Sequence, residues 1–155
     1  MAEPKDNPGV IAWPPLVFAA TITTGGLLHL VWPVRLLPTG PARVGGAVFA
    51  LLAGTLASWA ERMMKVADTN VRPDRPTTAI VTTGPYRFTR NPMYVALCLL
   101  HLGISLLIDG LLPLLFLIPL ILVLHFGVIR REEKYLTAKF GAEYLALQHR
   151  VRRWL

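Results

Sequence analysis

The chain has 155 residues, the length of a single domain, and we treat residues 1–155 as one domain. Hydrophobic residues make up 54% of it and its mean hydropathy is +0.49, which is too apolar for an ordinary soluble domain of this size. The formal net charge of +7 lies mainly between the apolar runs, which favours contact with anionic membrane lipids and argues against a nucleic-acid partner.

Apolar segments follow one another along the chain and predict an all-α fold, an integral membrane helical bundle with about four transmembrane helices. We expect these spans over roughly Trp13–Trp32, Val44–Ala60, Met93–Ile108 and Leu111–Ile129. The first has tryptophan near each end, as at a membrane interface, and the second is rich in Gly and Ala, which suits close helix packing. The third is expected to begin at Pro92, with Asn91 as its N-cap.

The third and fourth segments are separated only by Asp109-Gly110, so we expect a tight turn and two antiparallel neighbouring helices. Pro113 and Pro119 predict a kink in the fourth helix. This hairpin brings the residues around Asn91–Tyr94 to the same end as Arg130–Glu133. The functional hypothesis depends on that juxtaposition.

Basic residues gather in the connection 61–91 and in the tail after residue 129, whereas the opposite side has only Arg35 and Arg43. The positive-inside rule therefore predicts cytoplasmic N- and C-termini. From the short chain and the absence of targeting signals we expect a bacterial inner-membrane protein. The tail is expected to form an amphipathic cytoplasmic helix, bent near Gly141, with an apolar stripe of Leu136, Phe140, Tyr144, Leu147 and Val151.

Two polar clusters flank the hairpin. A carboxylate of Glu132 or Glu133 can accept hydrogen bonds from a ribose or hold a cationic group, although charged pairs are also routine where a helix enters water. Arg130 and Arg131 can clamp an anionic group or serve as interfacial anchors. Both interpretations stay open for each pair.

The segment before the hairpin offers a second set of candidates. Ala79–Val81 is short and apolar and precedes the turn at Gly84-Pro85, so it can line an adenine pocket or be a plain loop. Tyr86 and Tyr94 can stack on a base or simply lie at the interface. The histidines show no metal-ligand spacing, and we predict no metal site.

In combination, these motifs are specific. Asn91-Pro92-Met93-Tyr94, Glu132-Glu133 and Phe140-Gly141-Ala142-Glu143-Tyr144 together resemble the isoprenylcysteine carboxyl methyltransferase and phospholipid methyltransferase family. In that family a Thr-Ser-Gly-x-Tyr-like stretch leads into Arg-His-Pro-x-Tyr; here Thr82-Thr83-Gly84-Pro85-Tyr86 leads into Arg90-Asn91-Pro92-Met93-Tyr94. The similarity covers about residues 71–155.

The resemblance implies an integral membrane methyltransferase that uses S-adenosylmethionine, with the cofactor-binding part at about residues 71–155. The acceptor is expected to be a lipid-like or prenylated small molecule, methylated on a carboxylate, thiol or amine, and membrane lipids are the expected surroundings. The implied cofactor-binding residues are Thr78, Ala79, Ile80, Val81, Tyr86, Asn91, Pro92, Met93, Tyr94 and Glu132. Arg130, Arg131 and Glu133 are the candidate catalytic residues at the acceptor.

The sequence departs from the family at two positions. Asn91 replaces the histidine of the eukaryotic carboxyl methyltransferases; it can still form hydrogen bonds but cannot transfer a proton. The substrate-binding arginine of the family aligns with Val128, and Arg130 is the nearest arginine.

Two other functions remain open from sequence. Membrane sterol reductases have a similar C-terminal pattern and bind a reduced nicotinamide dinucleotide, but they are much longer. A non-enzymatic four-span transporter or scaffold is the other alternative, although transporters usually need an acidic residue deep within a span. The sequence names neither the acceptor nor the oligomeric state.

Overall fold

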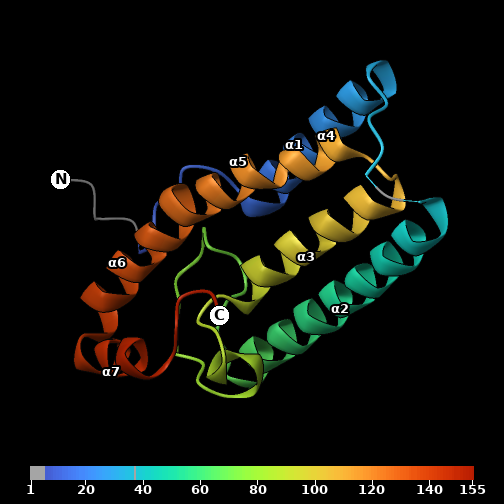
Figure 1. Ribbon diagram of the computed structural model, residues 1–155. Helices are drawn as coiled ribbons and strands as arrows, with labels where there is room; N and C mark the ends of the chain where they lie inside the picture. The colour runs from blue at the N-terminus through green and yellow to red at the C-terminus, as the bar shows by residue number, and fades with distance from the viewer. Residues whose placement is uncertain (1–5, 37) are drawn as a thin grey trace.

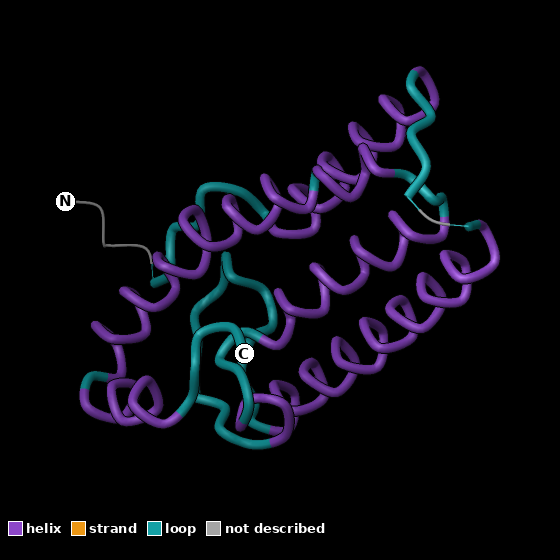
Figure 2. The backbone as a smooth tube through the Cα atoms, viewed as in Figure 1, coloured by secondary structure: helices purple, strands orange, loops and turns teal. Residues whose placement is uncertain are grey.

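The computed structural model describes residues 6–36 and 38–155, which form helices joined by loops (Figure 1). The described residues contain no strand; Thr89 and Arg152 form one isolated parallel bridge. Loops gather mainly at the two ends of the long helices (Figure 2). The all-helical prediction is confirmed.

The first two helices lie close to their predicted positions. Helix α1 covers Pro14–Val31 and α2 covers Thr39–Val66. Helix α2 is longer at both ends than the apolar pattern predicted. Its polar last turns stay helical, and Glu61 pairs there with Lys65 at 2.6 Å, a favourable i,i+4 arrangement.

Helix α3 covers Pro92–Leu107, with Asn91 at the N-cap position and Pro92 as its first residue, as predicted. Pro92 fits there because the first helical amide has no carbonyl partner inside the helix. The Asn91 side chain makes no capping bond; its Nδ2 instead donates to the carbonyl oxygen of Arg153 at 2.8 Å. The loop before α3 is thereby tied to the C-terminal segment.

The predicted fourth helix is interrupted. It consists of α4 (Leu111–Leu115), α5 (Leu117–Leu122), a π-helical segment, η2 (Val123–Ile129), and α6 (Arg130–Phe140). The break at Phe116 lies between Pro113 and Pro119, and Pro119 has no amide hydrogen to donate to the preceding turn. The interruption confirms the effect predicted for these prolines.

The tail turns at Gly141, as predicted, and α7 follows over Ala142–Arg150. Gly141 has φ +53°, a left-handed conformation that costs little without a Cβ atom. Three residues of the predicted apolar stripe, Tyr144, Leu147 and Val151, are buried, and they pack against the partly buried Ile80, Leu136 and Phe140. In the structure this stripe covers the loop before α3.

The long helices pack side by side, with α3 between α2 and the α4–α5 line, and with α1 against α4 and α5 (Figure 1). Close packing of α2 on α3 depends on small residues. A Cβ atom on Gly46 would lie 2.7 Å from the Gly103 carbonyl oxygen, and one on Gly103 would lie 2.8 Å from the Ala50 amide nitrogen. This confirms the predicted use of the Gly- and Ala-rich second segment.

Among the described residues, three helices are long and apolar enough to cross a membrane: Pro14–Val31, Gly40–Val66 and Leu111–Phe140. The apolar helix Pro92–Leu107 has 16 residues and is shorter than this criterion requires. The structure thus supports three candidate spans, one fewer than the sequence predicted.

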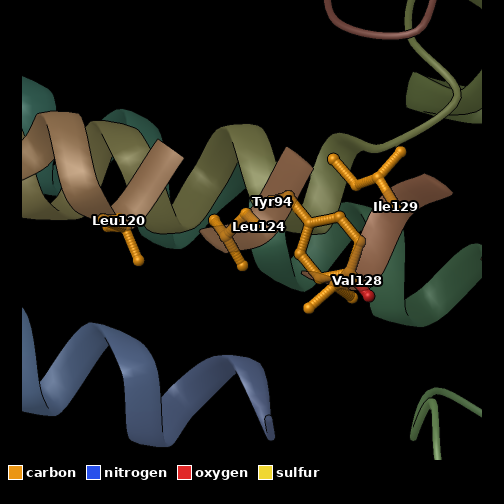
Figure 3. Packing of buried hydrophobic residues seen from close by; sticks show 5 residues of the cluster. All are labelled: Tyr94, Leu120, Leu124, Val128 and Ile129. Carbon is orange, nitrogen blue, oxygen red and sulfur yellow. The ribbon is translucent and has the colours of Figure 1, made fainter. Parts of the chain in front are cut away.

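The hairpin core lies where α3 faces the interrupted helix. Tyr94 packs with Leu124, Val128 and Ile129, and Leu120 lies further along the same helix line (Figure 3). The last four of these side chains are fully buried. The Tyr94 ring is thus fixed by packing, and its hydroxyl group is available for hydrogen bonding.

Candidate functional site

A cavity of about 430 Å³ lies at the end of the bundle where α3 begins and α6 emerges. Its size is within the range of small-molecule sites. The predicted residues that line the cavity come from α3, the loop before it and α6; they are Ala79, Ile80, Val81, Tyr86, Asn91, Pro92, Met93, Tyr94, Glu132 and Glu133. The predicted turn at Asp109-Gly110 does bring the two motifs into one cavity.

The apolar part of the lining comes from further along the helices. On α2 it consists of Ala50, Ala53, Gly54, Ala57 and Met64, and on α3 of Ala96, Leu97 and Leu100. The segment that leads into α1 contributes Pro8, Trp13, Pro14 and Pro15. The first two helices therefore form part of the cavity wall, a role that the sequence did not reveal.

The polar part begins with Tyr94 and Glu132. The Tyr94 hydroxyl donates to Glu132 Oε1 at 2.6 Å, a short charge-assisted hydrogen bond that links α3 to α6. Tyr86, in the 3₁₀ turn η1 (Gly84–Arg87), lies nearby. Burial, helped by the Glu132 carboxylate, raises the pKa of Tyr86 well above its usual value, so its hydroxyl stays protonated and able to donate.

Glu133 is buried and forms an ion cluster with two arginines, the buried Arg90 and the more exposed Arg153. Arg90 Nη2 lies 3.0 Å from Glu133 Oε1, while Arg153 donates from Nε to Oε1 at 3.0 Å and from Nη2 to Oε2 at 2.7 Å. Both carboxylate oxygens are thus occupied, and the cluster keeps one excess positive charge. Such a buried group is costly to disrupt.

The C-terminal segment places Arg153. The Arg90 amide donates to the Arg152 carbonyl oxygen at 3.0 Å, and the Thr89 hydroxyl donates to that of Arg153 at 3.2 Å. Trp154 Nε1 donates to His125 Nδ1 at 3.2 Å. The end of the chain is therefore fastened across the mouth of the hairpin.

The loop 69–81 is shaped by Thr69. Its hydroxyl oxygen accepts hydrogen bonds from the amides of Thr78 at 3.1 Å and Ala79 at 3.4 Å. Thr78 itself does not line the cavity: its hydroxyl donates to the Asp68 carbonyl oxygen at 2.6 Å. Of the predicted stretch Thr78–Val81, the last three residues reach the cavity and Thr78 supports them from behind.

Arg130 and Arg131 are placed outside the cavity lining. The Arg130 guanidinium lies over the Phe126 ring, 5.7 Å from its centroid. Arg131 Nη1 donates to the Gly9 carbonyl oxygen at 3.0 Å. Of the three candidate catalytic residues, only Glu133 lines the cavity, because the helix turns the side chains of Arg130 and Arg131 outward.

Several cavity residues were absent from the predicted set. One of them is Arg90, which directly precedes the Asn91-Pro92 motif. The sequence could have marked it as a site residue, because the predicted hairpin brings it close to Glu133. Tyr144 and Leu147 belong to the predicted apolar stripe but not to the predicted site. Burial raises the pKa of Tyr144 to about 12. Nothing in the sequence pattern points to Arg153.

No group of three or more His, Cys, Asp or Glu side chains in the described ranges 6–36 and 38–155 is placed to hold a metal ion. His101 is buried, with Nε2 2.9 Å from the Pro113 carbonyl oxygen. The chemistry on offer is therefore that of carboxylates, guanidiniums and phenol hydroxyls beside an apolar wall.

The chain is similar to known proteins. An uncharacterized protein of Haemophilus influenzae is 44% identical over 63 residues, which are 41% of this chain and all of that protein. The family model for phospholipid methyltransferases matches residues 41–143, from α2 to the start of α7. The chain therefore belongs to the phospholipid methyltransferase family.

Proposed function

We propose that this protein transfers a methyl group from S-adenosylmethionine to a lipid-like or small hydrophobic acceptor at the cytoplasmic membrane face. Membership of the family implies methyltransferase activity, and the apolar helices identify a membrane protein. The observation that carries the proposal is a single cavity with the Tyr94–Glu132 pair and the Glu133 cluster in one part and an apolar wall in the rest. Such a cavity suits a polar donor and an apolar acceptor.

The cavity lining offers groups that match the parts of S-adenosylmethionine. Backbone and small side chains of Ala79–Val81 offer a surface for an adenine ring, and Tyr86 offers a ring and a hydroxyl. Glu132 offers carboxylate oxygens to a ribose or an ammonium group. Asn91 lines the same region, although its Nδ2 is already committed to the Arg153 carbonyl oxygen.

S-adenosylmethionine, when bound, supplies an electrophilic methyl group: the acceptor's lone pair forms the new bond as the carbon–sulfur pair returns to sulfur. The contribution of the protein is to position both molecules in line and to exclude water. A carboxylate acceptor needs no base at neutral pH, whereas an amine must first lose a proton. Because both oxygens of Glu133 are engaged by arginines, it is a poor base, and Glu132 is the other carboxylate in the described lining.

The acceptor is proposed to enter from the membrane between helices. The wall formed by Ala50, Ala53, Gly54 and Ala57 consists of small side chains and leaves room for a hydrocarbon chain. A side chain on Gly54 would meet no atom within 4 Å at its Cβ position.

The membrane arrangement follows the same proposal. The N-terminal segment, the loop before α3, and α6–α7 lie at one end of the bundle, and the described loop between α1 and α2 lies at the other (Figure 1). We propose that α3 also crosses the membrane. Its 16 residues reach about 24 Å at 1.5 Å per residue, and the flanking loop spans the rest of the hydrocarbon thickness. Both termini are then cytoplasmic, in a bacterial inner membrane.

The test is calorimetric titration of S-adenosylmethionine and S-adenosylhomocysteine into the detergent-purified protein and into Glu132→Ala. Glu61→Ala is the matched control, because Glu61 is an exposed carboxylate paired only with Lys65 among the described contacts. We expect saturable binding to the wild type and to the control, and loss in Glu132→Ala. A folded wild type that binds neither ligand, or that selects reduced nicotinamide dinucleotide, contradicts the proposal.

A further inference from the structure

Arg90 is a buried cation with unused donors. Its side chain is 9% exposed and lines the cavity, and its Nη2 contacts Glu133. Its Nε and Nη1 atoms are buried and have no hydrogen-bond partner among the described residues. A buried donor without a partner costs roughly 1–3 kcal/mol, more when it is charged. The structure therefore holds a guanidinium that needs a further acceptor.

Arg153 explains why Glu133 does not satisfy Arg90 completely. The Arg153 guanidinium takes both oxygens of Glu133, which leaves Arg90 sharing only Oε1. One carboxylate thus pairs with two guanidiniums, and of these two the Arg90 guanidinium lines the cavity. An anionic ligand group would supply both the missing acceptor and the missing charge.

Glu132 provides the complementary feature. It lies in the same lining, and the Tyr94 hydroxyl occupies its Oε1. A carboxylate and a guanidinium with free donors in one cavity lining match the two charged groups of an α-amino acid, an ammonium and a carboxylate on one carbon. This pairing favours an amino-acid group over a phosphate or a fatty acid, neither of which carries an ammonium to place near Glu132.

We infer that Arg90 binds the α-carboxylate of the methyl donor through its Nε and Nη1 donors, with Glu132 accepting from the neighbouring ammonium. This inference rests on the proposed function and assigns the amino-acid end of the donor to the Arg90–Glu132 part of the cavity. Arg153 is a positioning residue: it holds Glu133 so that Arg90 keeps its donors free for the ligand.

The experiment compares S-adenosylmethionine with its decarboxylated analogue, which lacks only the carboxylate. Affinities are measured by calorimetry on the full chain in detergent, for the wild type, Arg90→Gln and Arg90→Lys. Arg87→Gln is the control, since Arg87 is exposed and does not line the cavity. Helical content by circular dichroism checks folding, and Arg90→Lys keeps a cation beside Glu133 if the glutamine variant does not fold.

In the wild type and in Arg87→Gln we expect the decarboxylated analogue to bind at least tenfold more weakly. In Arg90→Gln the carboxylate has lost its charge-assisted contact, so its presence should no longer matter. The affinities of the two ligands should then lie within about threefold of each other. Arg90→Lys should show an intermediate ratio, because a single point charge replaces the planar donors.

Equal binding of the two ligands to the wild type would overturn this assignment while leaving the proposed function intact. A preference that survives in both Arg90 variants would do the same. Binding of laurate to the wild type that is lost in Arg90→Gln, with donor preference unchanged, would assign Arg90 to an acidic acceptor instead. If the wild type binds neither donor ligand, the proposed function and this inference fall together.

Discussion

The two parts of the cavity are built in opposite ways. The polar part is made of side chains fixed by other side chains: Tyr94 holds Glu132, and Arg90 and Arg153 hold Glu133. The apolar part includes a stretch of α2 whose residues have almost no side chain, Ala50, Ala53, Gly54 and Ala57. The polar part therefore selects a ligand by charge and direction, and the apolar part by available space. Substitutions should affect the two parts differently.

The largest effect is expected where the polar part also stabilises the fold. Glu133→Gln removes the negative charge shared by Arg90 and Arg153 and leaves the buried Arg90 guanidinium without a counter-charge, beside the more exposed Arg153. Breaking such a buried cluster costs about 3–5 kcal/mol. Thermal unfolding in detergent should show a large decrease in midpoint. Glu61→Gln, at an exposed pair, is the control; an equal midpoint for the two variants would show that the cluster contributes no stability.

A substitution in the core tests whether stability and binding can be separated. Leu120 is fully buried and does not line the cavity. Leu120→Ala should lower the free energy of unfolding by about 2–5 kcal/mol, as deletion of a buried leucine side chain does. The affinity for S-adenosylhomocysteine, measured well below the unfolding midpoint, should stay close to that of the wild type. A parallel loss of affinity would mean that the polar part depends on this core.

The apolar part is tested by filling it. Gly54→Phe places a ring where the structure leaves space, so the acceptor should bind more weakly by about 10- to 200-fold, the range for steric changes in apolar pockets. Transfer of a tritiated methyl group into extracted membrane lipids gives the apparent KM. Gly26→Phe is the matched control, since Gly26 also faces open space, on α1, but outside the cavity. An unchanged KM in Gly54→Phe would remove α2 from the acceptor site.

The smallest effects are expected at Arg130 and Arg131, which sequence reasoning placed at the acceptor. The Arg130 contact with Phe126 is exposed and worth about 0.5–1 kcal/mol. Arg130→Ala and Arg131→Ala should each change the apparent acceptor KM by less than about threefold. An increase comparable to that of Gly54→Phe would favour the original assignment of these arginines.

Local sequence patterns predicted the hairpin and the proximity of the two motifs at its end. The Asp109-Gly110 turn leaves no room for another topology, so Tyr94 and Glu132 had to meet. The proline interruption at Phe116 and the turn at Gly141 follow equally from backbone chemistry. The part of α2 that lines the cavity could not be predicted. A Gly- and Ala-rich segment predicts close packing, but it does not show which residues will line a cavity instead of contacting another helix.

The contacts of the C-terminal segment also could not be predicted from the sequence. Arg153 meets Glu133 only because residues 151–154 return along the loop before α3, and that return depends on long-range backbone hydrogen bonds. The outward placement of Arg130 and Arg131 depends on helix rotation, which a run of four charged residues does not specify. Arg90 precedes Asn91 at the end of the hairpin where Glu133 also lies, but its unused donors are visible only in three dimensions.

The most direct test of one cavity with two separable parts is the dissociation constant of S-adenosylhomocysteine for the wild type, Glu132→Gln and Gly54→Phe, measured side by side. The account predicts saturable binding to the wild type, at least tenfold weaker binding to Glu132→Gln, and binding to Gly54→Phe within about twofold of the wild type. Equal weakening in both variants, or an unaffected Glu132→Gln, would contradict it.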